Sequence, residues 1–75
     1  MTLAQLKVGS CGIITDVGGD GALRRRLLDM GLTPKTKVMM RRVAPLGDPI
    51  EIYLRGYELT IRKEDANKIQ IEEVE

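Results

Sequence analysis

Short β-prone runs separated by turns containing glycine or proline recur along this chain, and they limit the folds that it can adopt. Five such runs are expected to be strands: 11–17, 37–43, 50–55, 58–63 and 69–74. In the third run Ile50, Ile52 and Leu54 alternate with polar or aromatic residues, so one face should be buried and the other wet. The spacing favours a small β-barrel over a parallel sheet, and closing the barrel would remove exposed strand edges.

One amphipathic helix is predicted between the first two strands. Leu23, Leu27 and Met30 recur at helical spacing, and arginines occupy the opposite face. Asp20 is the expected N-cap, and Gly31 stands where a left-handed C-cap residue is expected. Short helical turns are also predicted at 2–6 and 64–68. A chain of 75 residues has room for one domain, covering residues 1–75.

The composition excludes most enzyme chemistry. The chain has no histidine and one cysteine, Cys11, so neither a Ser-His-Asp triad nor a Cys/His zinc site can be built within it. The aspartates and glutamates are scattered, and we expect no catalytic residue, metal site or cofactor. Ferrous iron sites commonly recruit histidine with carboxylate, so we expect no tight iron binding by the isolated monomer. No apolar run is long enough to span a bilayer, and no secretory signal is visible, which favours the cytoplasm.

The glycine run 18–21 precedes the predicted helix, where phosphate-binding loops are found. A P-loop, however, ends in Lys followed by Ser or Thr, whereas Ala22 and Leu23 follow here. We therefore interpret the run as a structural turn. A second tight turn is predicted at 33–36, with Pro34 at its first central position.

The charges are distributed unevenly although the formal net charge is only +1. Residues 24–42 hold one acid, Asp29, and 63–75 are mainly acidic. The basic residues of the first region are Arg24, Arg25, Arg26, Lys35, Lys37, Arg41 and Arg42. Either they are a solvated surface or they form a docking surface for an acidic protein patch. Nucleic acid is disfavoured, because the net charge is low and the chain lacks Phe and Trp for base stacking.

Two further features suggest contact with another protein. Met39 and Met40 are consecutive in a strand, so one must face away from the core. It would either offer a soft contact beside Arg41 or pack under the Pro45-Leu46 loop. The loop 44–49 contains two prolines and Leu46, and a stiff loop with an apolar tip loses little entropy on binding.

Three stretches of the chain together resemble the FeoA family: LRRRLLDMGLTP at 23–34, RVAPLGDPIEI at 42–52 and LRGYELTIRKEDA at 54–66. The resemblance covers about residues 3–74. It implies an SH3-like β-barrel of five to six short strands with the helix inserted after the first strand. Many members carry Thr-Pro-Gly-Thr after the helix, and here Lys35 takes the glycine position. If that turn requires positive φ, Lys35 costs about 1 kcal/mol.

The resemblance also implies a function. It suggests a non-enzymatic cytosolic accessory of bacterial ferrous iron transport that acts with FeoB, a membrane permease with a cytosolic GTP-binding domain. The predicted partner is this FeoB-like permease or its GTP-binding domain, and the oligomeric state is monomer or weak dimer. The alternative is a free-standing regulatory interaction module related to the C-terminal domains of iron-dependent repressors. Our candidates for partner contact are Arg24, Arg25, Met30, Arg42 and Leu46.

Overall fold

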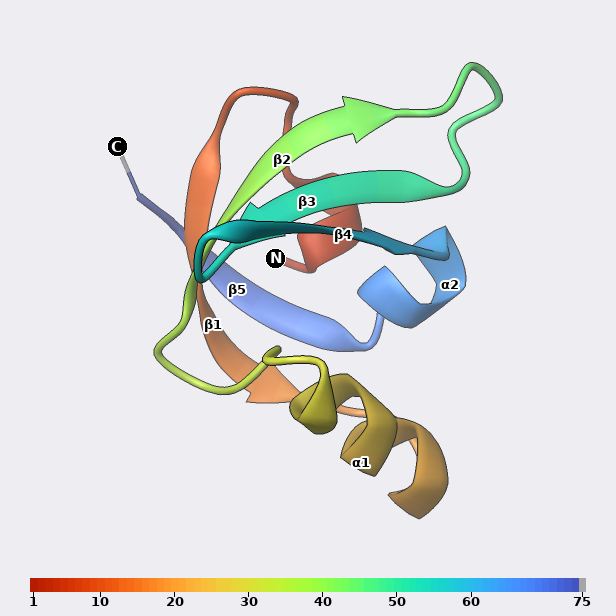
Figure 1. The fold of residues 1–75 in the computed structure, drawn as a ribbon. Coiled ribbons are helices and arrows are strands. Elements are labelled where there is room, and N and C mark those ends of the chain that lie inside the picture. Colours follow the sequence, from red (N-terminus) through yellow and green to blue (C-terminus); the bar gives the residue numbers. More distant parts are fainter. Residues whose placement is uncertain (75) are drawn as a thin grey trace.

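Five antiparallel strands in a single curled sheet form the body of the protein (Figure 1). The structure is a computed structural model and describes residues 1–74. The strands are β1 (Cys11–Val17), β2 (Lys37–Val43), β3 (Ile50–Leu54), β4 (Tyr57–Ile61) and β5 (Ile69–Val74). The helical elements are the 3₁₀ turn η1 (Leu3–Gln5), α1 (Gly21–Asp29) and α2 (Lys63–Ala66). The spatial order of the strands is β4-β3-β2-β1-β5.

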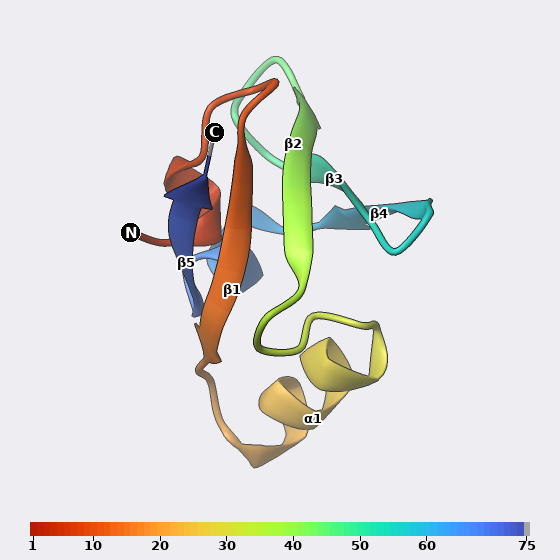
Figure 2. The same cartoon turned by 90° about the vertical axis from the view of Figure 1, so that its left-hand side faces the viewer.

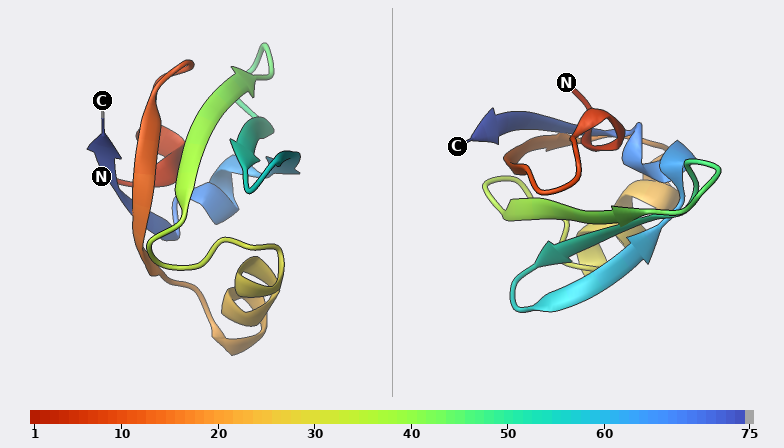
Figure 3. Two further views of the ribbon diagram at one scale, coloured as in Figure 1. Left: turned by 60° about the vertical axis from the view of Figure 1, so that its left-hand side comes forward. Right: turned by 90° about the horizontal axis from the view of Figure 1, so that it is seen from above.

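The hydrogen-bonded ladder does not close into the predicted barrel. Within residues 1–74, β4 and β5 are not paired and remain the two edges of the sheet. In the view from above in Figure 3, η1 and α2 lie inside the curl, toward the gap between these edges. The N-terminal residues cover part of the β5 edge, since Thr2 bridges to Gln70 and the Ile71 amide donates to the Met1 carbonyl at 2.8 Å. Helical elements and the N-terminus therefore replace the missing strand pairing.

The core lies on the concave side of the sheet, and every strand contributes to it. Ile14, Ile52 and Ile69 are at most 1% exposed, while η1 supplies Leu3 and α1 supplies Leu27, both at 0%. Leu23, Leu28 and Met30 pack against this core while partly exposed, as expected for the apolar face of an amphipathic helix. The other buried apolar residues of the core are Leu6, Val17, Leu32, Val38, Met40, Ile50, Leu54, Ile61, Ala66 and Ile71.

The termini of α1 have the chemistry expected from the sequence. The Asp20 carboxylate accepts a hydrogen bond from the Leu23 amide at 2.8 Å. At the other end Gly31 has φ +96°, and the Leu32 amide donates to the Leu27 carbonyl at 3.1 Å. That pattern is a Schellman motif, in which glycine supplies the left-handed residue that ends the helix. The glycine run before α1 turns the chain out of β1, with Gly19 at φ +97°.

The turn after α1 is the one predicted, and Lys35 is strained in it. The Thr36 amide donates to the Thr33 carbonyl at 3.1 Å, with Pro34 at the first central position. Lys35 has φ +75°, a conformation that favours glycine over residues with a Cβ. The turn therefore does require positive φ at Lys35, which is the condition on which the expected cost of about 1 kcal/mol depended.

Two element boundaries differ from expectation for identifiable reasons. β3 ends at Leu54 because Arg55 and Gly56, with φ +48° and +85°, form a two-residue hairpin turn into β4. Helix α2 begins at Lys63, where the sequence predicted strand, because the Lys63 amide donates to the Asp48 carboxylate at 2.9 Å. Asp48 lies on the β2–β3 loop, so a distant side chain caps the first turn of α2.

Candidate protein-contact surfaces

The β2–β3 connection is a tied loop with an apolar tip. The Ala44 amide donates to the Pro49 carbonyl at 3.0 Å, and the Gly47 amide donates to the Ala44 carbonyl at 2.7 Å. The Asp48 carboxylate fastens the same loop to α2, as described above. Leu46 at the tip is 97% exposed. The loop is thus pre-ordered, so that docking Leu46 in a partner would require little further ordering.

Apolar and basic residues surround this tip. Val43 is 37% exposed, and together with Pro45 and Pro49 it lines an open depression of about 450 Å³ at the base of the loop. Arg42 borders the depression and faces Glu51 across the strand pair at 3.5 Å. An exposed ion pair of this kind contributes little to stability, so Arg42 can exchange partners at small cost. We call Arg42, Val43, Pro45, Leu46 and Pro49 the loop surface.

The predicted contact residues around α1 have three different environments. Arg25 is exposed, whereas the Arg24 Nε donates to the Val17 carbonyl at 3.0 Å and ties α1 to β1. Met30 is half-buried against the core, and its carbonyl accepts a hydrogen bond from the hydroxyl of Tyr57. Arg25 is therefore the residue of this set that is most available to a partner.

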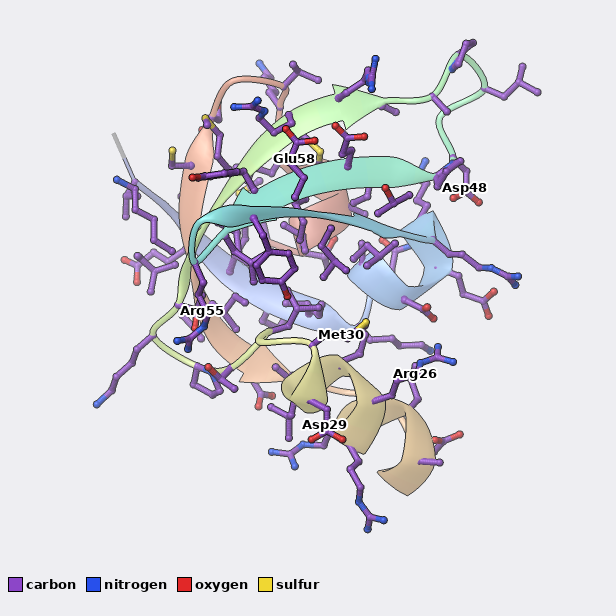
Figure 4. The ribbon with its side chains drawn as sticks, in the orientation of Figure 1. Arg26, Asp29, Met30, Asp48, Arg55 and Glu58 are labelled. Carbon is purple, nitrogen blue, oxygen red and sulfur yellow. The ribbon has the colours of Figure 1, made fainter. Side chains whose placement is uncertain are left out.

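The structure separates the five candidate residues into two groups. Arg24, Arg25 and Met30 lie around α1 at the lower end of the molecule, whereas Arg42 near the end of β2 and Leu46 in the β2–β3 loop lie at the upper end (Figures 1 and 2). Met30 and the loop residue Asp48 mark these two regions in Figure 4. One compact partner patch cannot include all five, because the sheet stands between them.

Ion pairs compensate part of the uneven charge distribution. Arg26 pairs with Asp65 at 3.4 Å, and Arg41 pairs with Glu58 at 3.0 Å. The basic region thus contacts acids of β4 and α2 in the folded chain. Sequence order alone does not bring these groups together.

Sequence reasoning missed the polar contacts of Arg55, which was assigned to a strand end. Its guanidinium donates to the hydroxyls of Thr33 and Thr36, both at 2.8 Å, and to the Gly31 carbonyl at 3.3 Å. These bonds, with that of Tyr57 to Met30, join the β3–β4 turn to the α1–β2 loop. Figure 4 shows Arg55 beside that loop. Alternation in the sequence placed Arg55 on the solvent-exposed face of a strand, and this pattern does not indicate that its side chain bonds to the α1–β2 loop.

The two consecutive methionines face opposite sides of β2. Met40 is 1% exposed in the core, whereas Met39 is half-buried on the outer face. Met39 stands opposite Cys11 of β1 and Tyr53 of β3. It lines a hollow with these residues and not the depression at the base of the loop, so packing under the Pro45-Leu46 loop was the wrong alternative.

The described part of the chain contains no cluster of three His, Cys, Asp or Glu side chains able to hold a metal ion. None of its helices has the length and apolar character needed to cross a membrane. Within residues 1–74, every buried side-chain nitrogen or oxygen has a hydrogen-bond partner.

Comparison with known proteins gives a consistent result. The family model described as the FeoA domain matches residues 1–73. The chain is 36% identical over 72 residues to an Fe(2+) transport protein A/Fe(2+) transporter FeoB fusion protein of Porphyromonas gingivalis; the match covers 96% of this chain and 8% of that protein. It is also similar to the solution structure of the FeoA protein from Chlorobium tepidum, with 41% identity and a TM-score of 0.92, over 100% of this chain and 71% of the other.

More distant structures share the fold. The zinc complex of Stenotrophomonas maltophilia FeoA, described as an SH3 domain protein, matches with a TM-score of 0.84 and 22% identity over 96% of this chain and 89% of the other. A manganese-dependent transcriptional repressor matches with a TM-score of 0.89 and 12% identity over 97% of this chain and 40% of the other. At these identities the likeness concerns the fold alone.

Proposed function

Because this chain belongs to the FeoA family, we propose that it is a cytosolic, non-enzymatic accessory of bacterial ferrous iron transport that acts by contacting the FeoB permease or its GTP-binding domain. The observation that carries the proposal is the relative in which an Fe(2+) transport protein A segment is fused to FeoB. Fusion holds two modules at high effective concentration, which favours even a weak contact between them. The chain spans only 8% of that relative, and the proposal assigns it the contact with FeoB and not the transport itself.

The loop surface is the part of the molecule best suited to this contact. Burying a leucine side chain fully contributes about 1.5–3 kcal/mol, and Leu46 leaves nearly all of that unused in the free protein. The hydrogen bonds within the loop and from Lys63 to Asp48 reduce the entropy lost on docking. Arg42 adds a guanidinium that can bind a partner carboxylate through two hydrogen bonds.

Arg25 on α1 is proposed as a second, separate contact. Arg24 and Met30 support it indirectly, since they hold α1 against β1 and the core. A partner that reached both the loop surface and Arg25 would have to extend along the length of the molecule. No observation favours the alternative role as a regulatory module, because the similarity to a transcriptional repressor concerns the fold alone.

Calorimetric titration against the isolated GTP-binding domain and against the full FeoB transporter tests the proposal. Wild-type protein should bind one or both, and Leu46→Ser should weaken binding about tenfold, corresponding to about 1.4 kcal/mol of lost burial. Leu46→Met keeps an apolar tip and should bind like wild type. Absence of wild-type binding to both preparations would refute the proposal, and unchanged affinity of Leu46→Ser would remove the loop surface from it.

A further inference from the structure

The outer face of the sheet carries a row of side chains aligned across all five strands. The paired positions are Val74, Cys11, Met39, Tyr53 and Glu58, one each from β5, β1, β2, β3 and β4. Cys11 and Met39 are half-buried, and Tyr53 is 38% exposed. Figure 2 looks onto this face, and within the described residues no helix lies in front of β1 or β2. The apolar members of the row are therefore open to a partner.

A hollow of about 360 Å³ lies in the middle of this face. Its lining includes the outward-facing Cys11, Met39 and Tyr53 together with Lys37 and Arg55. Binding cavities for small molecules begin at about 300 Å³ and enclose most of their ligand, whereas this hollow is open. Its size and openness suit one large apolar side chain of a partner. Met39 is a flexible, polarizable lining residue that adapts to such a side chain.

A second depression continues the hollow toward the α1–β2 turn. Its volume is about 340 Å³, and its lining shares Lys37 and Arg55 with the first while adding Pro34, Lys35 and Thr36. The two depressions adjoin at Lys37 and Arg55, and together they make a surface that is apolar at the Met39 end and basic at the Lys35 end. We call it the outer-face groove.

The basic end carries positive charge that the protein itself does not neutralise. Within residues 1–74, Lys35 and Lys37 have no carboxylate within ion-pair distance. Arg55 donates to neutral hydroxyls and a carbonyl, so its charge is held in place but not compensated. A fixed guanidinium flanked by two mobile ammonium groups complements carboxylates on a partner.

We propose that the outer-face groove binds an extended acidic peptide segment of a partner protein. One large apolar side chain of the segment occupies the hollow between Cys11, Met39 and Tyr53. Acidic residues next to it lie against Lys37, Arg55 and Lys35.

Single-stranded nucleic acid fits the groove less well than such a peptide. The Arg41 guanidinium lies 5.4 Å from the centre of the Tyr53 ring, so that one face of the only aromatic ring in the groove is already covered. Base stacking on aromatic rings is the main source of sequence-tolerant affinity for single strands, and the groove offers little exposed aromatic surface for it.

The groove differs from the loop surface, so the two proposals can fail independently. Arg41 lies two residues beyond Met39 on β2, between the hollow and the loop surface. Binding of a peptide in the groove does not require FeoB as its source, and FeoB binding through Leu46 does not require the groove.

Fluorescence polarisation with a short labelled peptide, a leucine pair followed by a run of glutamates, tests the proposal on the full chain. Lys37→Glu should weaken binding about tenfold, since it replaces attraction by repulsion at the centre of the basic end. Lys37→Met, which removes only the charge, should have a smaller effect in the same direction. Lys68→Glu makes the same charge change at an exposed position between α2 and β5, outside the linings of both depressions, and should alter affinity less than about twofold. Circular dichroism confirms that each variant is folded.

Two further readouts locate the peptide. Amide shifts in nuclear magnetic resonance spectra should concentrate at Lys37, Met39 and Arg55 and spare Leu46. A peptide with serines in place of the leucines should bind more weakly, and one with lysines in place of the glutamates should not bind.

Four results would overturn the proposal. They are absence of saturable binding by the acidic peptide, equal losses from Lys37→Glu and Lys68→Glu, equal affinity of the serine peptide, and tighter binding of single-stranded oligouridylate that Lys37→Glu abolishes. The last result would assign the groove to nucleic acid.

Discussion

Replacing Arg55 should remove the side-chain hydrogen bonds that join the β3–β4 turn to the α1–β2 loop, and so should destabilise the fold. Arg55→Asn removes two hydrogen bonds of 2.8 Å to the hydroxyls of Thr33 and Thr36 and a longer one to the Gly31 carbonyl. Each of the two short bonds should contribute about 1 kcal/mol, and the longer one little. The two hydroxyls still bond to each other at 2.9 Å, so neither becomes an unsatisfied buried group and the loss stays at the low end.

Backbone strain offsets part of that loss. Arg55 sits at φ +48°, and asparagine tolerates this left-handed conformation better than arginine, by about 0.5 kcal/mol. The net cost should be about 1.5 kcal/mol in the free energy of unfolding. For a domain of this size that corresponds to a fall in Tm of about 6–12 °C.

Thermal melting followed by circular dichroism, with urea titration at a fixed temperature, measures the change. Lys7→Asn is the matched control: it removes one exposed charge and should change stability by less than about 0.5 kcal/mol. Arg55→Lys keeps the charge but loses the planar fork, so it should recover only a minor part of the stability. If Arg55→Asn has the same Tm as the Lys7→Asn control, the hydrogen bonds to the threonines do not stabilise the fold and the reasoning is wrong.

Three other substitutions should give defined results. Asp20→Ala removes the hydrogen bond to the Leu23 amide and should cost about 1 kcal/mol by urea denaturation, while Asp20→Asn should keep most of it; equal losses would deny the cap. Lys35→Gly relieves the strain at φ +75° and should stabilise the protein by up to about 1 kcal/mol in the same assay, and a loss of stability would show that the turn is not strained. Asp48→Ala removes the acceptor for the Lys63 amide, so it should cost about 1 kcal/mol and weaken FeoB binding although Leu46 is intact; unchanged affinity would mean that loop order does not matter for binding.

Local features of the fold were predictable because their causes lie close together in the sequence. The helix follows from the spacing of Leu23, Leu27 and Met30, and its ends follow from Asp20 and Gly31, which lie within a few residues of the groups that they bond. The five strands follow in the same way from alternation and turn residues. The family was also recognisable, since the FeoA domain model matches residues 1–73.

Features that depend on contacts between distant residues were not predictable in this way. The open ladder is one, because η1, α2 and the N-terminus fill the gap that a barrel would close with β4–β5 pairing. The capping of α2 by Asp48 and the hydrogen bonds of Arg55 to residues 19 to 24 positions earlier in the chain are others. For the candidate site, the sequence identified exposed residues such as Arg25 and Leu46 but not that they lie at opposite ends.

The amino-acid sequence by itself therefore determined the kinds of element, their order, the family and the lack of histidine chemistry, because periodicity, capping and composition act over a few residues or none. Tertiary structure decided which side chains share a surface. Strand register set Cys11, Met39 and Tyr53 side by side, and the hairpin turn carried Arg55 to Lys37 and the α1–β2 loop. These juxtapositions arise from pairing between segments far apart in the chain, whose energies are settled only when the whole sheet has formed.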